Sequence, residues 1–315
     1  MLINKKSKIF IAGHNGMAGT AILKYLKKKN YLNLIVETKK KLNLLDQKDT
    51  EKFLKKTKPN CVIIAAARVG GIYANQNNKA NFIYENIMIQ TNLIHASFKA
   101  GVKKLIFLGS SCIYPKYSKQ PIKETELLTG KLEPTNDAYA IAKIAGIKMC
   151  EAYNAQHKLN YICLMPTNMY GPNDSYDTKN SHFYPALIKK IFLAKKQNKR
   201  FVTVWGNGES KREVMFVDDL AHACEFFLRK KVNHTLINIG TGQEKKIKDF
   251  YKFIMKKFNC KFKLIYDKSK PNGTPRKMLD TKVAKSYGWQ SSISLDKGFR
   301  LTLEDFIKNK KFKQK

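Results

Sequence analysis

The sequence predicts a doubly wound α/β fold, in which helices cover both faces of a parallel sheet. Short strands that are apolar throughout alternate with amphipathic helices over the first half of the chain, a pattern typical of sheets that are buried on both faces. A glycine-rich turn joins the first strand to the first helix. After about residue 168 this alternation loosens, which predicts a smaller, discontinuous C-terminal part without a clean linker.

The strand and helix patterns can be followed in order along the chain. Strands are predicted over 8–13, 33–38, 61–67, 103–110 and 160–167, and helices over 17–29, 49–57, 80–100 and 138–157. Short elements follow at 201–205 and 263–267, whereas a helix over 218–230 and a strand over 235–240 are expected to return to the first sheet. We therefore predict one domain of residues 1–168 with returns near 214–242, and a second domain of residues 169–213 and 243–315.

The composition excludes several classes of protein. With 315 residues and 43% hydrophobic content, the chain has enough apolar material for a core, which excludes disorder and collagen. Its apolar runs are shorter than the roughly 18 residues of a membrane helix, and its N-terminal apolar stretch is too short for a signal peptide. The six cysteines are widely spaced without a C-x-x-C pair, so we expect neither a metal site nor a disulfide framework. A reduced cytoplasm is the expected location.

The formal charge of +36 raises the question of a nucleic-acid partner. Lysine supplies almost all of the excess, and the lysines are spread over the whole length of the chain. Specific nucleic-acid sites favour arginine, which contacts bases and phosphates through two parallel donors. We expect no nucleic acid and no membrane as partner, although a functional polyanion-binding surface stays open as an alternative. A positive field would also steer an anionic small-molecule substrate.

The turn after the first strand has the spacing G-x-x-G-x-x-G, from Gly13 to Gly19. Glycines allow a tight turn and a close approach of the backbone to a pyrophosphate at the positive end of the next helix. This turn predicts a Rossmann-like sheet that binds a dinucleotide. At the end of the second strand, Glu37 favours an unphosphorylated ribose, whereas the following lysines at 39–41 favour a 2′-phosphate. We predict NADP(H), with NAD as the less favoured alternative.

Tyr139 and Lys143 form a Y-x-x-x-K pair on the helix that follows the fourth strand. Residues four apart share one helix face, so the Lys143 ammonium is expected to lower the pKa of Tyr139 and make it a proton donor and acceptor near neutrality. Ser110, at the end of the fourth strand, is positioned to hydrogen-bond a carbonyl oxygen. From the residues alone, Cys112 is as readily a small buried side chain, and His182 a loop histidine.

Longer stretches of the chain carry a family resemblance. FIAGHNGMAG, FLGSSCIYP, EPTNDAYAIAKIAGIK, MPTNMYGPND and NGTPRK resemble the GDP-L-fucose synthase family of extended short-chain dehydrogenase/reductases, and the resemblance runs from about residue 8 to about residue 300. It implies that Ser110, Tyr139 and Lys143 carry out a reduction, and that Cys112 and His182 are the acid/base pair of an epimerisation. It also implies a homodimer.

The resemblance further implies two sets of binding residues. The cofactor set comprises Gly13, His14, Asn15, Gly16, Met17, Ala18, Gly19, Lys39, Asn43, Leu44, Leu108, Gly109, Ser110, Ser111, Lys143, Pro166, Thr167, Asn168, Met169 and His182. The substrate set comprises Lys190, Trp205, Arg212, Asn272 and Lys277, with Arg276 nearby. Asn15, Lys39 and Lys190 stand where members of the family often carry arginine, so a planar bidentate group is replaced at each position.

The expected activity is NADPH-dependent C4 reduction, with C3/C5 epimerisation, of a GDP-4-keto-6-deoxy sugar. The product would be GDP-L-fucose or a close relative. One alternative is a C4 reductase of a GDP-4-keto-6-deoxy-heptose with little or no epimerase activity, for surface polysaccharide synthesis. A remote alternative is a non-catalytic dinucleotide sensor.

Overall fold

A parallel sheet with helices on both faces forms the larger part of this computed structural model, which describes residues 3–177, 181–270, 273–310 and 313. In the described residues the sheet has six strands in the order β2-β1-β3-β4-β5-β9, with every neighbouring pair parallel. Its strands are β1 (Lys8–Ala12), β2 (Asn33–Ile35), β3 (Cys61–Ile64), β4 (Lys104–Leu108), β5 (Asn160–Pro166) and β9 (Leu236–Ile239). The chain passes from β1 outward to β2 and then back to β3, so the order of the strands reverses between β1 and β3. Ligands of such sheets bind at the carboxyl ends of the strands near this reversal.

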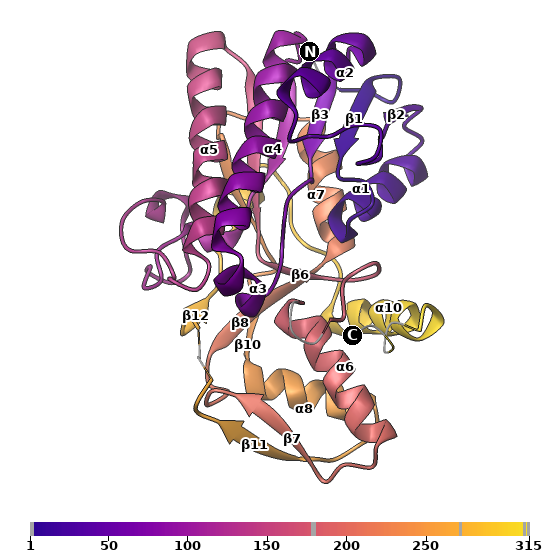
Figure 1. Cartoon of the computed structure of the whole chain (residues 1–315), viewed down its shortest axis with the longest axis vertical. Helices are drawn as coiled ribbons and strands as arrows, with labels where there is room; N and C mark the ends of the chain where they lie inside the picture. Colours follow the sequence, from indigo (N-terminus) through magenta and orange to yellow (C-terminus); the bar gives the residue numbers. More distant parts are fainter. Residues whose placement is uncertain (1–2, 178–180, 271–272, 311–312, 314–315) are drawn as a thin grey trace.

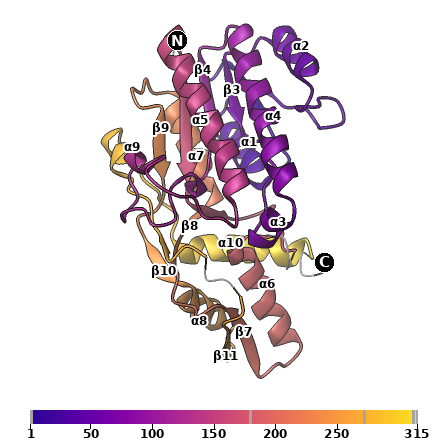
Figure 2. The same ribbon diagram turned by 60° about the vertical axis from the view of Figure 1, so that its left-hand side comes forward.

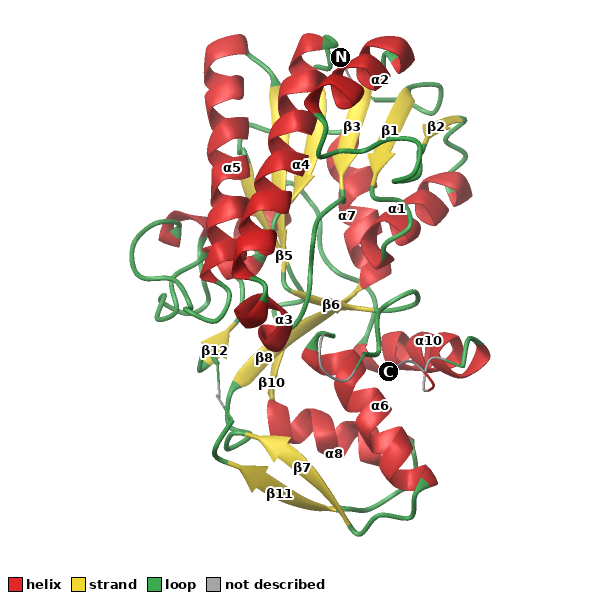
Figure 3. Cartoon of the chain, in the orientation of Figure 1, coloured by secondary structure: helices red, strands yellow, loops and turns green. Residues whose placement is uncertain are grey.

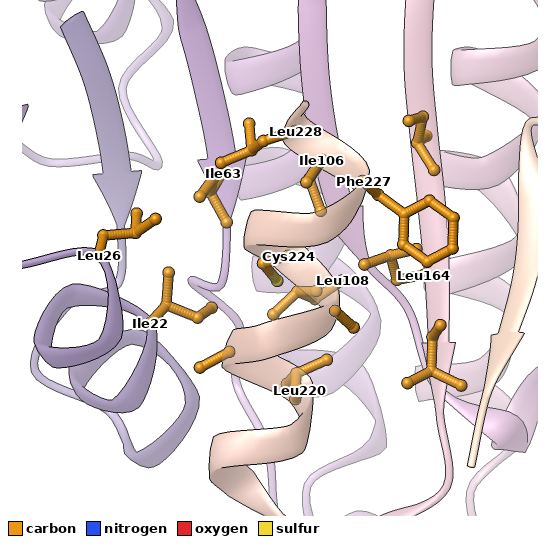
Figure 4. Packing of buried hydrophobic residues seen from close by; sticks show 14 of the residues in the cluster. Ile22, Leu26, Ile63, Ile106, Leu108, Leu164, Leu220, Cys224, Phe227 and Leu228 are labelled. Atoms are coloured by element: carbon orange, nitrogen blue, oxygen red, sulfur yellow. The ribbon is translucent and has the colours of Figure 1, made fainter. Parts of the chain in front are cut away.

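Helices α1 (Met17–Lys28) and α7 (Val217–Leu228) cover one face of the sheet, and α2 (Gln47–Thr57), α4 (Lys79–Lys99) and α5 (Asp137–His157) cover the other (Figure 1). Along β3, Ile63 packs in the core on the α1/α7 side, whereas Val62 and Ile64 pack on the opposite side. This alternation is the reason why successive residues inside the strand are all apolar. On the α7 side, Leu220, Cys224, Phe227 and Leu228 lie against the sheet (Figure 4).

The remaining elements form a smaller part at the carboxyl end of the sheet (Figure 2). Strand β8 (Lys211–Phe216) pairs with β6 (Asn168–Tyr170), β10 (Glu244–Lys246) and β12 (Arg276–Lys277), while β7 (Phe201–Trp205) pairs with β11 (Lys263–Asp267). Helices α6 (Phe183–Lys196), α8 (Ile247–Lys257) and α10 (Leu295–Lys308) accompany these strands (Figure 3). Their side chains share a third core rich in aromatic rings, among them Tyr184, Phe216 and Phe250.

Short elements complete the chain. They are α3 (Ile72–Asn77), α9 (Lys282–Ser286) and the 3-10 turns Ser111–Ile113 and Glu124–Glu126. None of the helices that the structure describes combines the length and the apolar composition of a membrane-spanning segment. All six cysteines carry free thiols.

The predicted fold class is confirmed, and α7 and β9 return to the large sheet as expected. The predicted bounds of several strands are wrong at the carboxyl end. The second strand ends at Ile35 rather than residue 38, the third at Ile64 rather than 67, and the fourth at Leu108 rather than 110. At these points the chain leaves the ladder, and its residues form loops at the edge where ligands bind. Helices α3, α6, α8, α9 and α10 were outside the prediction.

Candidate active site

The glycine turn packs tightly against the end of β3. Gly13 has φ +86°, and a Cβ on it would lie 2.5 Å from the Ala66 nitrogen. A Cβ on Gly19 would collide with the Gly13 carbonyl oxygen. Gly16 caps α1 without a side-chain hydrogen bond, so the amide groups of the first turn of α1 face the loop without a competing side chain. A turn and helix start of this kind form a cradle for a pyrophosphate.

The loop after β2 presents three exposed lysines, at 39, 40 and 41. The Glu37 carboxylate accepts a hydrogen bond from the backbone nitrogen of Thr38 at 2.8 Å. Further along, the Leu44 carbonyl accepts a hydrogen bond from Asn92 of α4 at 2.9 Å, which fixes the loop to the body of the sheet. The positive charge of the lysines suits a phosphate on the ribose.

Ser110 and Tyr139 line the same cavity, and Lys143 lies behind them in the core. Ser110 follows β4, and its Oγ accepts a hydrogen bond from the Cys112 nitrogen at 3.3 Å. The Lys143 Nζ donates to the Leu108 carbonyl at 2.9 Å and lies 5.8 Å from the centre of the Tyr139 ring. Lys143 is 2% exposed.

The expected lowering of the Tyr139 pKa is wrong in this structure. Burial raises the pKa of Tyr139 above its ordinary value, and the neighbouring Cys112 raises it further. Burial also lowers the pKa of Lys143 to about 7. The Lys143 amine is bonded to a backbone carbonyl and is itself partly neutral, so it does not acidify the phenol. A phenol with a raised pKa keeps its proton at neutral pH, and the protonated form is the one that can donate to an alkoxide.

The thiol of Cys112 lies between two donors. Its Sγ accepts hydrogen bonds from the Lys277 Nζ at 3.3 Å and from the Asn136 Nδ2 at 3.1 Å. Burial acts to raise the pKa of Cys112, but the charge of Lys277 and hydrogen bonds from Ser110, Lys277 and Asn136 outweigh it, and the pKa is lowered. His182 precedes α6, and its pKa is lowered by burial and then by the charge of Lys277.

A cavity of about 630 Å³ connects these groups. Of the residues named from the sequence, those that line it are Met17, Gly109, Ser110, Ser111, Cys112, Tyr139, Pro166, Thr167, Asn168, Met169, His182, Lys190, Trp205, Arg212 and Lys277. The cavity therefore extends from the start of α1 to the β7 and β8 strands of the smaller part. Both of its ends carry basic side chains or a helix N-terminus, which suits an elongated anionic ligand.

Other named residues lie outside the lining of this cavity. They are Gly13, His14, Asn15, Gly16, Ala18, Gly19, Lys39, Asn43, Leu44, Leu108, Lys143 and Arg276. Arg276 is bonded instead to the carboxylate of Glu244, with Nε–Oε distances of 2.8 and 2.9 Å. Two basic groups of the cavity are held by backbone carbonyls: Lys190 donates to Thr203 and Arg212 to Thr274, both at 2.6 Å. Asn272 lies outside the described residues.

Several polar residues of the lining were absent from the predicted set, among them Asn75, Glu133, Thr135, Asn136 and Ser181. Thr135 Oγ1, Asn136 Oδ1 and Ser181 Oγ are buried and have no hydrogen-bond partner among the described residues. Thr135 and Asn136 belong to the stretch EPTNDAYAIAKIAGIK, whose position in front of Tyr139 was the available signal. The cavity is thus lined with unpaired polar atoms beside Cys112 and His182, as expected of a site that binds a hydroxylated ligand.

The fold and the site together define a class of protein. A parallel sheet with a glycine cradle after β1 and a Tyr-x-x-x-Lys pair on the helix after β4 is the arrangement of an extended short-chain dehydrogenase/reductase. The chain belongs to the NAD dependent epimerase/dehydratase family, whose model matches residues 9–240.

Relatives and solved structures resemble the chain over nearly its whole length. It is 48% identical to the putative GDP-L-fucose synthase 2 of Arabidopsis thaliana, covering 98% of this chain and 94% of the relative. It is 46% identical to the GDP-L-fucose synthase of Escherichia coli (strain K12), covering 96% and 98%. A GDP-6-OMe-4-keto-L-xylo-heptose reductase from C. jejuni superposes with a TM-score of 0.91 at 33% identity, covering 98% and 100%. A GDP-mannoheptose C4 reductase from Campylobacter jejuni with NADP bound has a TM-score of 0.88 at 36% identity, covering 97% and 99%.

Proposed function

We propose that this protein catalyses the NADPH-dependent C4 reduction, with C3/C5 epimerisation, of a GDP-4-keto-6-deoxy sugar. The product is GDP-L-fucose or a close relative. One observation carries the proposal: a single cavity brings a hydroxyl pair, Ser110 and Tyr139, together with a thiol and an imidazole, Cys112 and His182. Support comes from the 46% and 48% identity to GDP-L-fucose synthases.

The residues after β1 and β2 fit NADP(H). Gly13 and Gly19 leave no room for a Cβ, so the backbone of the turn is free to approach a pyrophosphate. Lys39 and its two neighbouring lysines supply positive charge for a 2′-phosphate, and Asn43 and Leu44 continue this loop. A C4 reductase of similar structure holds NADP. When bound, the cofactor supplies the hydride for the reduction.

Epimerisation is assigned to Cys112 and His182. A ketone at C4 acidifies the C–H bonds at C3 and C5. The Cys112 thiolate takes a proton from the carbon, and the electron pair moves to the C4 oxygen as an enolate. Hydrogen bonds from Ser110 and Tyr139 stabilise this oxygen. The His182 imidazolium then returns a proton to the opposite face, which inverts the centre without net oxidation or reduction.

Reduction uses the same carbonyl. The hydrogen bonds from Ser110 and Tyr139 polarise the C4 ketone, and the Tyr139 hydroxyl transfers its proton to the alkoxide as it forms. The high pKa of Tyr139 ensures that this proton is present at neutral pH. Lys143 supports the wall behind the phenol through its hydrogen bond to Leu108. Lys190, Trp205, Arg212 and Asn272 are assigned to the GDP-sugar.

The direct test supplies GDP-4-keto-6-deoxymannose and NADPH to the purified protein. We expect NADPH to be consumed and the product to show inverted C3 and C5 centres by NMR. The variant Tyr139→Phe should lose about 10²- to 10⁴-fold in kcat while it still binds NADPH, as followed by cofactor fluorescence. A protein that binds NADPH without oxidising it would favour a dinucleotide sensor instead. A Phe variant with intact turnover would show that Tyr139 is not the proton donor.

A second candidate is a C4 reductase of a GDP-4-keto-6-deoxy-heptose with little or no epimerase activity. The observation in its favour is the close superposition with two heptose reductases. The two candidates differ in the product. A heptose reductase should turn over a GDP-4-keto-heptose faster than the hexose and should leave C3 and C5 protons unexchanged in D₂O.

We further propose the division of labour and the assembly that the sequence indicates. Residues 1–168 with 214–242 bind NADP(H), and residues 169–213 and 243–315 bind the GDP-sugar. The protein acts as a homodimer in the cytoplasm. Helices α4 and α5 lie side by side and expose Tyr84 and Ile141, at 60% and 47%, which supports an apolar interface there. Light scattering tests the dimer, and charged substitutions at both positions should dissociate it.

A further inference from the structure

The cation next to the Cys112 thiol comes from a segment distant in sequence. Lys277 is the second residue of β12, which pairs in parallel with β8 so that Lys277 lies beside Arg212. Successive side chains of a strand point to opposite sides. Arg276 accordingly points to Glu244, at 2.8 Å, and Lys277 points to the cavity and donates to the Cys112 Sγ at 3.3 Å.

Several charged or titratable groups face the cavity around Cys112. They are Lys277 of β12, Arg212 of β8, Tyr139 of α5, Glu133 before α5 and His182 before α6. Glu133 pairs with Lys116 at 3.1 Å, and Arg212 donates to the carbonyls of Lys211 and Thr274. Among these charged groups, the hydrogen bond to the sulfur that the structure records comes from Lys277.

We propose that Lys277 is a positioning residue for epimerisation, holding the Cys112 sulfur in its negatively charged form rather than acting only as a ligand of the GDP-sugar. The inference rests on the proposed function of Cys112 as the proton acceptor. An ammonium 3.3 Å from sulfur stabilises a thiolate over a thiol. Asn136 completes the arrangement with a neutral donor, and its place before α5 links the base to the helix that carries Tyr139.

The same cation acts on the acid of the pair. A positive charge disfavours an imidazolium as it favours a thiolate, and the pKa values of His182 and Cys112 are both lowered by Lys277. Removal of the cation should therefore raise both pKa values. The epimerisation rate plotted against pH should have two limbs, one set by the thiolate and one by the imidazolium. Without the cation, both limbs should move to higher pH. A merely structural role would reduce the height of the profile without moving it.

The first experiment measures the thiol directly in the full-length protein without substrate. Alkylation of Cys112 by iodoacetamide is followed against pH, with mass spectrometry to separate Cys112 from the other five cysteines. In Lys277→Met the midpoint should rise by roughly one pH unit, and in Lys277→Arg it should stay near that of the wild type. Lys245→Met removes one charge at an exposed position of β10 and should leave the midpoint unchanged. Thermal unfolding verifies that each variant is folded.

Two alkylation results would overturn the proposal. One is an unchanged midpoint in Lys277→Met. The other is an equal shift in Lys245→Met, which would assign the effect to the overall field of the protein.

The second experiment measures exchange of the sugar C3 and C5 protons in D₂O, with GDP-4-keto-6-deoxymannose and no NADPH. In Lys277→Met both limbs of the exchange-rate profile should move to higher pH by roughly one unit, while in Lys277→Arg they should stay near their wild-type positions. A raised KM with unmoved limbs would mean that Lys277 only binds the substrate, and would refute the proposal. A wild-type protein that exchanges neither the C3 nor the C5 proton of the sugar would refute the proposed epimerisation. The alkylation experiment would still show whether Lys277 stabilises the Cys112 thiolate.

Discussion

The Lys143 side chain occupies an unfavourable environment for a charged group. Its amine is buried in the core behind Tyr139, with one hydrogen bond to Leu108 and the ring of Phe107 at 4.6 Å. Burial holds its pKa at about 7, so folding at lower pH must either bury a charge or remove a proton. The cost is tolerable only if the amine serves the activity, because an apolar residue of similar length would fit the same space.

Lys143→Met should therefore stabilise the fold while it lowers turnover. The native pKa lies below the unfolded value, so the unfolded state binds more protons between the two values and the burial cost declines as pH rises through that range. The gain should be on the order of 2 kcal/mol at pH 7 and below, and should shrink toward pH 10. Denaturant unfolding at several pH values measures it.

The matched control is Lys148→Met. Lys148 is exposed on the same helix and pairs with Glu151 at 2.8 Å, so its loss should change the free energy of unfolding by less than about 0.5 kcal/mol. Two results would contradict a burial cost of the Lys143 charge. One is a Lys143→Met protein that is less stable than the wild type, and the other is a gain in the free energy of unfolding that is the same at pH 6 and pH 9.

At the residue scale, the positions of motifs relative to the strands predicted which residues form the site better than neighbouring charges predicted their pKa values. The position of Tyr139 after the fourth strand was predictable from the sequence, because the alternation of strands and helices allows the strands to be counted along the chain. The direction of the pKa shift of Tyr139 was not predictable from the sequence. It depends on the partner of the Lys143 amine, which is the carbonyl of Leu108, 35 residues away in the chain. Asn136 and its bond to Cys112 were missed for the same reason: contacts across the chain carry no local pattern.

At the scale of elements, the large sheet was predictable because its strands, apart from β2 at the edge, are buried on both faces and so are mostly apolar. The elements of the smaller part were harder to predict from the sequence. The short elements expected at 201–205 and 263–267 coincide with the bounds of β7 and β11. Helices α6 and α8 were missed, although both bury an apolar face. Strand β12 has two residues, and such a short strand carries no periodicity. Its pairing with β8 is nevertheless what brings Lys277 to the site.

Glu213 of β8 connects the segments that follow β9 and β12. Its buried carboxylate accepts backbone hydrogen bonds from Thr241 at 2.5 Å and Gly242 at 2.7 Å after β9, and from Leu279 at 3.0 Å after β12. Glu213→Ala should lower the free energy of unfolding by about 3 kcal/mol, because three amides lose their acceptor. Hydrogen exchange should show faster exchange at Leu279, two residues from Lys277.

Glu209→Ala is the control for this prediction. Glu209 is an exposed carboxylate that pairs with Lys246 at 2.8 Å and with Lys248, and surface pairs of this kind contribute about 1 kcal/mol or less. Equal destabilisation by the two substitutions, or an unchanged exchange rate at Leu279 in Glu213→Ala, would show that Glu213 does not hold β12 in place.

At the scale of the whole molecule, the net charge of +36 surrounds a cavity proposed to bind two anionic nucleotides. The charge is spread over exposed lysines on both parts, so it acts through the summed field rather than through one pair. Such a field accelerates the encounter with anions, and salt screens it over about 10 Å at 0.1 M and about 3 Å at 1 M.

Raising NaCl from about 0.05 M to 0.5 M should lower kcat/KM for the GDP-sugar several-fold, because the encounter is screened. The value of kcat should change little, since the contact between Lys277 and Cys112 is short, at 3.3 Å, and lies inside the cavity. Initial rates at saturating and limiting substrate separate the two parameters, with sorbitol at matched osmolarity as control. A flat kcat/KM would mean that the lysines do not steer the substrate. Strong inhibition by DNA at 0.15 M salt, beyond that of free GDP, would instead favour a polyanion-binding surface.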